Sequence, residues 1–144
     1  MRYIALAGFL ILTACSPAPP PTHDTGLPPW YESTVAQLVE VNREAEAAFD
    51  NGKADAAAAK IKQGQSLAAR ILSVPQPTLP AAEAAADVDD LYGRMLLANR
   101  HYAWAEMFFQ KNRARWKNWN PKTPETERRL KEAESQIAEC DRHI

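Results

Sequence analysis

Residues 87–111 read DVDDLYGRMLLANRHYAWAEMFFQK, and this stretch decides the fold class. Apolar side chains recur every three or four positions over residues 88–96, which is the spacing of one face of an α-helix. Residues 99–101 (NRH) interrupt the pattern, and apolar side chains return over residues 105–109. The stretch therefore predicts two helices joined by a tight turn.

Toward the N-terminus, the same spacing predicts a first helix whose apolar face runs over residues 35–49, and a second helix over about residues 54–72. Between them, Asp50-Asn51-Gly52 is typical of a helix end, because Asn and Gly tolerate the left-handed backbone conformation found there. Residues 74–80 (VPQPTLP) contain three prolines, which predict extended backbone. We therefore expect the third helix to begin in the alanine-rich stretch after Pro80.

Toward the C-terminus, a helix is expected over about residues 102–117. Thr123-Pro124-Glu125 then offers a capping hydroxyl, a proline for the first turn and an acid near the positive end of the helix dipole. The last helix has a narrow apolar stripe formed by Leu130, Ala133, Ile137 and Cys140. No segment alternates as a strand does. The sequence predicts an all-α fold of about five helices, arranged as two antiparallel hairpins plus a C-terminal capping helix.

The first fifteen residues have the pattern of an export signal. Arg2 precedes the apolar run of residues 3–12 (YIALAGFLIL), which is shorter than the roughly 20 residues that a membrane-spanning helix needs. Leu12-Thr13-Ala14-Cys15 resembles the lipobox of bacterial lipoproteins. The resemblance implies a signal peptide over residues 1–14, lipid on Cys15 and, from Ser16, the periplasmic face of an outer membrane if the cell has one. The alternative is an ordinary signal peptide with a chance cysteine.

The segment after Cys15 predicts a stalk. Residues 16–29 (SPAPPPTHDTGLPP) hold six prolines and few apolar side chains, so we expect an extended linker between a lipidated residue 15 and a folded domain over residues 30–144. The whole chain has 17 basic and 18 acidic residues, a balance that disfavours a nucleic-acid partner. Cys140 would be the only cysteine left unlipidated, and we expect it to be buried or to pair with another chain.

The second hairpin resembles a tetratricopeptide repeat. Gly93 matches the small residue of the first helix in that repeat, Tyr102 and Ala105 match the start of the second, and Phe109 matches the aromatic further along. The first hairpin fits less well: Ala45 and Ala57 can serve as small positions, but the spacing between repeats is 48 residues and not the usual 34. The resemblance implies a concave surface that binds polypeptide.

These features lead us to expect a non-catalytic adaptor or assembly factor in the cell envelope. Its partner would be an envelope protein or a second copy of the chain, in addition to membrane lipid through Cys15. We expect the partner to bind in a groove between the first and third helices. The contact residues would lie in this groove or next to it. These positions are Asn42, Tyr92, Leu96, Asn99 and Trp104.

A second expectation concerns residues 111–122 (KNRARWKNWNPK), which combine five basic residues with two tryptophans. This segment could bind cell-wall polymer or anionic lipid directly, with tryptophan as an anchor. The alternative, which we favour, is a helix end whose cations complement the dipole while its tryptophans pack on the last helix. Trp119 is expected to be more exposed than Trp116. The basic-aromatic patch would comprise Arg113, Arg115, Trp116, Lys117 and Trp119.

No motif for catalysis, metal binding or a cofactor is evident. The three histidines fall in the linker, a turn and the tail, without the spacing of metal ligands. We expect Asp87, Asp89 and Asp90 to lie in an early turn of the third helix, where acids are favoured by the dipole. An enzyme would require a desolvated Glu106 or His101 in a cleft. The sequence therefore favours a protein that is not an enzyme.

Overall fold

The computed structural model describes residues 26–144. The expected signal segment, Cys15 and the linker up to residue 25 lie outside the described residues. Residues 26–144 contain no strand and form α1 (Tyr31–Asp50), α2 (Ala54–Ile71), α3 (Leu79–Ala98), α4 (Tyr102–Asn118) and α5 (Pro124–Asp141). The prediction of an all-α fold with about five helices is confirmed.

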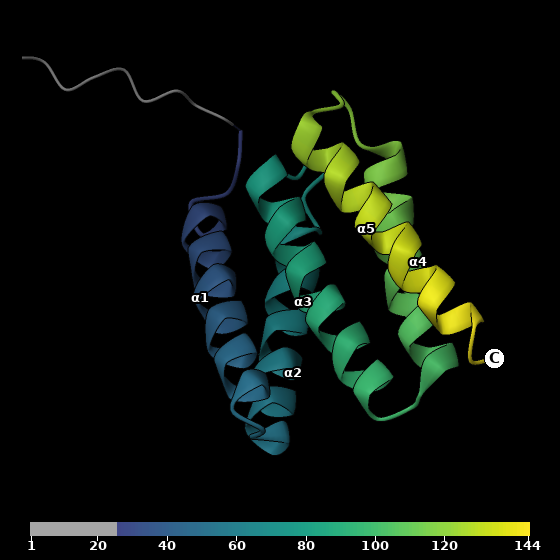
Figure 1. The fold of residues 1–144 in the computed structure, drawn as a ribbon. Helices are drawn as coiled ribbons and strands as arrows, with labels where there is room; N and C mark the ends of the chain where they lie inside the picture. The colour runs from purple at the N-terminus through teal and green to yellow at the C-terminus, as the bar shows by residue number, and fades with distance from the viewer. Residues whose placement is uncertain (1–25) are drawn as a thin grey trace, which may run out of the picture.

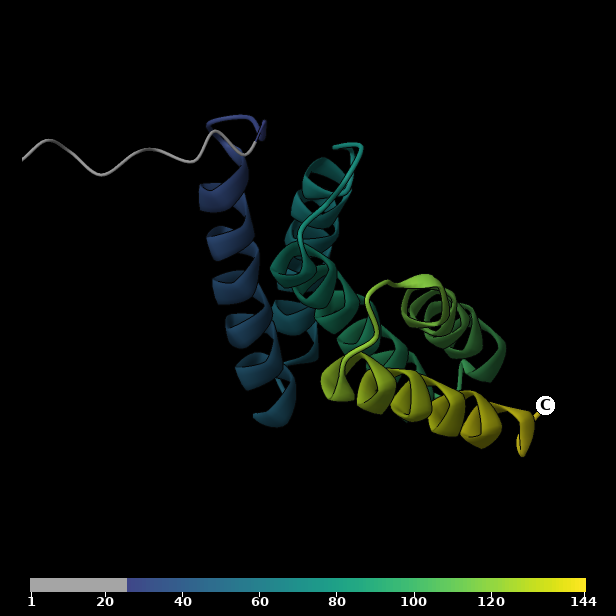
Figure 2. The same ribbon diagram turned by 90° about the horizontal axis from the view of Figure 1, so that it is seen from above.

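The helices form two antiparallel hairpins, α1–α2 and α3–α4, and α5 packs against α4. Figure 1 shows α1, α3 and α5 across the front of the molecule, with α2 and α4 behind them. Seen from above in Figure 2, the α1–α2 pair and the α4–α5 pair lie on opposite sides of α3. α3 is therefore the central helix of the domain.

Alanine allows α3 to be covered on two sides. Ala84 and Ala85 are buried in a core cluster with side chains of α1 and α2, whereas Ala82 and Ala86 belong to a second cluster around Trp116 of α4. A methyl side chain adds little width to a helix, so neighbouring helices can approach α3 closely from both directions. The alanine-rich sequence thus places α3 at the centre.

α3 begins at Leu79, so the expectation that it starts only after Pro80 is wrong by two residues. Thr78 is the N-cap, and its hydroxyl accepts a hydrogen bond from the backbone N–H of Ala81 at 3.4 Å. Pro80 lies in the first turn, where a helix does not use the N–H that proline lacks. Asp87 consequently lies more than two turns into the helix and not near its N-terminus.

Both hairpins turn through a residue with positive φ. In the first turn this residue is Gly52, with φ of 69°, which fits the expected helix end. In the second turn it is Arg100, with φ of 62°, a conformation that costs an L-residue more than it costs glycine. The N–H of His101 donates to the carbonyl oxygen of Leu96 at 2.9 Å and closes this turn.

Glycine permits close helix contact at two buried positions. A Cβ added to Gly64 of α2 would lie 2.9 Å from Val88 Cγ2, and one added to Gly93 of α3 would lie 2.5 Å from Phe109 Cε1. Neither distance leaves room for a methyl group. A small residue at position 93 against the partner helix agrees with the sequence analysis, while the resemblance to the repeat family itself stays a prediction.

α5 begins as the sequence predicts. Thr123 is the N-cap and forms a reciprocal capping box with Thr126, and Pro124 is the first residue of the helix. Its expected apolar stripe faces inward: Ala133 and Cys140 are buried, and the thiol of Cys140 is free. Burial is the main cause that raises the pKa of this thiol above its ordinary value. Among the described helices, none combines the length and apolar content needed to cross a membrane.

Candidate functional site

Two polar clefts lie next to each other on the face formed by α1, α3 and α5. The first, of about 160 Å³, is lined by α3, α4 and α5. The second, of about 450 Å³, lies between α1 and α3. Asp87 and Asp90 of α3 line both clefts, so the two hollows form one continuous surface that crosses the central helix.

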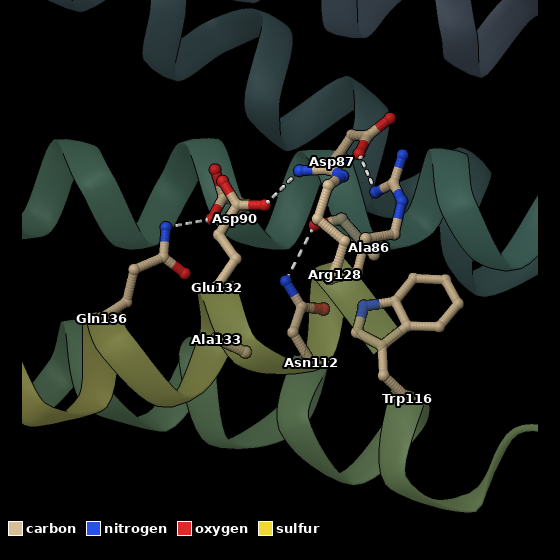
Figure 3. A pocket seen from close by; sticks show the side chains of 10 residues that line it. Ala86, Asp87, Asp90, Asn112, Trp116, Arg128, Glu132, Ala133 and Gln136 are labelled. Carbon is tan, nitrogen blue, oxygen red and sulfur yellow. Dashed lines mark hydrogen bonds and ion pairs between the residues drawn. The ribbon is translucent and has the colours of Figure 1, made fainter. Parts of the chain in front are cut away.

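Side chains from three helices meet in the first cleft (Figure 3). Arg129 of α5 donates to Asp87 of α3 at 2.6 Å and to Glu125 at 2.7 Å. Its guanidinium carbon lies 5.5 Å from the centre of the Trp116 ring, close enough for a cation–π contact. Gln136 donates to Asp90 at 2.5 Å. These contacts fix α5 against α3 by polar bonds at the surface.

The ion pairs of this face shift the pKa values of its arginines and of Glu125. Burial would lower the pKa of Arg129, but its hydrogen bonds to Asp87 and Glu125 outweigh that effect and raise it. The hydrogen bond from Arg128 is the main cause that lowers the pKa of Glu125 to about 2, and the bond from Arg129 adds to it. Glu125 and its two arginine partners, Arg128 and Arg129, are therefore a charged cluster beside the first cleft at neutral pH.

Arg94 plays the same bridging role in the second cleft. It donates to Glu46 of α1 at 2.7 Å and to Asp90 of its own helix at 2.9 Å. Burial opposes the charged form, yet these two carboxylates raise the pKa of Arg94 above its ordinary value. Val39 on the same wall is 54% exposed, so this cleft also offers an apolar contact.

Two asparagines anchor α3 through backbone carbonyls. Asn42 of α1 donates to the carbonyl oxygen of Ala84 at 2.7 Å, and Asn112 of α4 donates to that of Ala86 at 2.9 Å. The Oδ1 atom of Asn42 is buried without a hydrogen-bond partner, and it lies 3.3 Å from the place where a Cβ on Gly64 would be. Asn42 thus reaches into the helix interface, while its outer side contributes to the second cleft.

The acidic cluster of α3 differs from the sequence analysis. Asp89 is buried, with its side chain 3% exposed, and accepts from Lys111 at 2.9 Å and from Arg115 at 3.0 Å, both of α4. The expectation of a dipole-stabilised early turn is wrong, because α3 starts at Leu79. Asp89 instead joins α3 to α4, while Asp87 and Asp90 face the clefts.

Only one of the five expected partner-binding positions lies in a cleft, namely Asn42. Tyr92 packs edge-to-face on Phe108 of α4, with ring centres 4.8 Å apart, and Leu96 packs on a core cluster that includes Phe109. Asn99 ends α3, and Trp104 is exposed on α4. The five positions therefore do not share one groove. The sequence pattern could not show this, because it located the apolar stripes of α3 without showing which neighbour each one faces.

The basic-aromatic patch is not one exposed surface. Trp116 is 1% exposed and packs against Leu130 of α5, and Trp119 is half-buried beside it, which matches the expected order of exposure. The side chain of Arg115 is 12% exposed and is engaged by Asp89. The expectation of Trp116 as a surface anchor is wrong, and its packing on the last helix is confirmed.

Arg113 and Lys117 are the remaining members of that patch. Arg113 lies 3.6 Å from Glu134 of α5, with both side chains about half exposed, and Lys117 is exposed near the end of α4. Within residues 26–144, no three His, Cys, Asp or Glu side chains are grouped as metal ligands. His101 is exposed in its turn, and Glu106 accepts from Gln110 on the surface of α4 at 2.6 Å.

Comparison with known proteins gives no relative from which a function could be transferred. No family model matches the chain, and no curated protein or solved structure is significantly similar to it.

Proposed function

We propose that this chain is a lipid-anchored protein of the bacterial cell envelope that acts without catalysis, as an adaptor or assembly factor for another envelope protein. The observation that carries the proposal is the pair of clefts that share Asp87 and Asp90. Together they give a polar surface to which side chains of α1, α3 and α5 all contribute, so that one polypeptide segment could contact all three helices.

The charges on this surface suit exchange of partners. The side chain of Arg43 is 69% exposed in its pair with Glu40, and Arg128 and Glu132 are more than half exposed in theirs. Exposed ion pairs of this kind contribute only about 0–1 kcal/mol each, so a partner can replace them at little cost. A segment carrying both acidic and basic side chains would complement the surface.

The location follows from the N-terminal resemblance. The lipobox-like Leu12-Thr13-Ala14-Cys15 would place lipid on Cys15, and residues 16–29 would hold the domain away from the bilayer as a proline-rich stalk. A tether raises the effective concentration of the domain near other envelope proteins, which favours a weak polar contact. The periplasmic face of an outer membrane is the expected place if the cell has one.

The test is a crosslinking pull-down of the lipidated protein from its own envelope. One variant, Arg43→Glu with Glu132→Arg, reverses an exposed charge on the wall of each cleft and leaves the net charge unchanged. A matched control, Lys62→Glu with Asp141→Lys, makes the same exchange at exposed positions outside both clefts. A Cys15→Ala chain tests the need for the anchor.

We expect one stoichiometric envelope protein in the pull-down, retained by the Lys62/Asp141 control and lost with the Arg43/Glu132 variant. Loss with Cys15→Ala as well would support the anchored location. Recovery of lipid or wall fragments alone, or equal recovery of a protein partner with both charge variants, would refute the adaptor role of this face.

A further inference from the structure

The outer face of α4 exposes two large apolar side chains next to each other, Trp104 and Met107. Four large apolar side chains are more than half exposed in residues 26–144, and two of them, Trp104 and Met107, lie one turn apart on α4. The other two, Val39 and Ile144, lie singly on α1 and at the C-terminus. Single exposed apolar residues are ordinary, but a neighbouring pair that includes tryptophan marks a contact surface.

The fully exposed residues of this face include no acid, and the half-buried Glu106 at its edge accepts a hydrogen bond from Gln110 at 2.6 Å. The exposed residues follow the helical repeat along the whole length of α4. They are Ala103, Trp104, Met107, Gln110, Lys111, Ala114, Lys117 and Asn118. Arg100 is exposed in the turn that precedes the helix, so cations lie at both ends of the apolar pair. This is a cationic and aromatic helix face, unlike the mixed charges of the α1/α3/α5 clefts.

The support beneath this face is rigid. Phe108 is half-buried one turn after Trp104 and packs edge-to-face on Tyr92 of α3 at 4.8 Å. Lys111 is fixed by its bond to the buried Asp89, while its side chain stays 55% exposed. Asp89 also binds Arg115, so one buried negative charge faces two positive ones, and a net positive charge is left on this side of α4.

We infer that the outer face of α4 lies on a membrane surface that contains anionic phospholipid. Tryptophan and methionine enter the boundary between headgroups and acyl chains, and Lys111, Lys117 and Arg100 approach the phosphate groups. Tryptophan favours this boundary because its ring is apolar and its indole N–H can still reach water. The charge complementarity, with three exposed cations against one half-buried acid at the edge of the stripe, favours a lipid surface over a protein of mixed charge.

This inference goes beyond the proposed function and uses a different surface. α4 packs against α3 and α5, so its exposed stripe points away from the face that carries the clefts. A domain resting on α4 would therefore present α1, α3 and α5 away from the bilayer. The anchor would hold the domain at the membrane, and α4 would set its orientation.

The test is co-sedimentation with vesicles of equal parts phosphatidylglycerol and phosphatidylcholine, and with phosphatidylcholine alone. The chain from residue 15 onward, with Cys15→Ser, removes any acyl chain and retains every described helix. Trp104→Ala with Met107→Ala tests the apolar pair, against Val39→Ala as the matched control. Lys117→Gln tests charge, against Lys62→Gln on α2. Analytical ultracentrifugation of each chain reports self-association.

We expect binding to the anionic vesicles that weakens with salt and is much lower on phosphatidylcholine alone. The Trp104/Met107 variant should lower the partition coefficient by roughly a hundredfold, since burying each of the two side chains favours the membrane by about tenfold. Lys117→Gln should lower it by roughly fivefold, and the two controls by less than about twofold.

Three results would overturn the inference. One is an absence of binding to the anionic vesicles, and another is binding that the Trp104/Met107 variant leaves unchanged. The third is a dimer that this variant dissociates, because the face would then join two copies of the chain. Loss of vesicle binding with the pull-down partner retained would leave the proposed function intact, so the two proposals fail separately.

Discussion

Gly93 offers the sharpest test of how the second hairpin is packed. In Gly93→Ala, the new methyl carbon would lie 2.5 Å from Phe109 Cε1, 2.7 Å from Cζ and 3.1 Å from Cδ1. Phe109 is fully buried, so its ring cannot move into solvent to avoid the new methyl group. Overpacking of this kind costs about 1–3 kcal/mol, whereas alanine gains about 1 kcal/mol over glycine inside a helix. The net change in stability is therefore a loss of about 0–2 kcal/mol, in which the two effects partly cancel.

A double-mutant cycle separates these two effects. Phe109→Leu removes the ring atoms that the new methyl would meet, so Gly93→Ala in that background should gain its helix propensity and stabilise the protein. The propensity term is the same in both backgrounds and cancels, which leaves a coupling free energy of about 1–3 kcal/mol from the clash.

The cycle is measured by urea unfolding of the four chains, followed by far-UV circular dichroism. Gly64→Ala, whose methyl would meet Val88 Cγ2 at 2.9 Å, is a comparison site with a smaller clash, and it should not couple to Phe109→Leu. Additivity of Gly93→Ala and Phe109→Leu to within about 0.5 kcal/mol would refute the tight contact between α3 and α4 at this point.

Three further predictions concern polar groups and the thiol. Asp89→Asn should lower the free energy of unfolding by roughly 2 kcal/mol or more, because it leaves Arg115 without its buried counter-charge. Asp87→Asn, at an exposed ion pair, should cost less than about 1 kcal/mol. Equal effects of the two substitutions in urea unfolding would contradict the burial of Asp89. The pKa of Glu125 is lowered to about 2 in the folded state, so the ionised carboxylate stabilises the fold above its ordinary pKa of 4.5, and this contribution is lost as pH falls toward 2. Glu125→Gln should therefore flatten the decline of the melting temperature between pH 4.5 and 2. An unchanged decline would count against the ion pairs of Glu125 with the arginines. Cys140 should react with a thiol reagent only when urea unfolds the chain, since the side chain is fully buried; rapid labelling of the native protein would contradict its position.

The helices could be predicted from sequence because their signals are local. The 3.6-residue spacing, the Asn51-Gly52 break and the Thr123-Pro124 start each act within one or two turns, and the observed bounds agree with them. The start of α3 was harder, because Pro80 both prohibits a helix interior and favours a first turn. The hydroxyl of Thr78, which caps the helix, favours the first-turn position for Pro80.

The clefts were less predictable, because they depend on which helix lies beside which. Because the start of α3 was predicted too late, Asp89 was expected near the helix N-terminus. The helix dipole alone stabilises an acid there, so no partner was sought for Asp89. The signal that could have corrected this is the spacing of four between Lys111 and Arg115, which places two cations on one side of α4. Asp89 lies four residues after Ala85, within the buried stripe of α3. A buried carboxylate needs a cationic partner.

Asp87, Asp89 and Asp90 also connect the two proposed surfaces physically. Asp87 and Asp90 line the clefts at the front, whereas Asp89, between them in sequence, points to the back and holds Lys111 and Arg115 of α4. Because a helix fixes the Cα–Cβ directions of its residues relative to one another, α3 cannot rotate about its axis at one of these positions without moving the other two. If α4 rests on a membrane, the direction in which the clefts open is then fixed relative to that membrane, without any further contact. A substitution that breaks the ion pairs of Asp89 should therefore disturb both the clefts and the outer face of α4, although the Asp89 side chain belongs to neither surface.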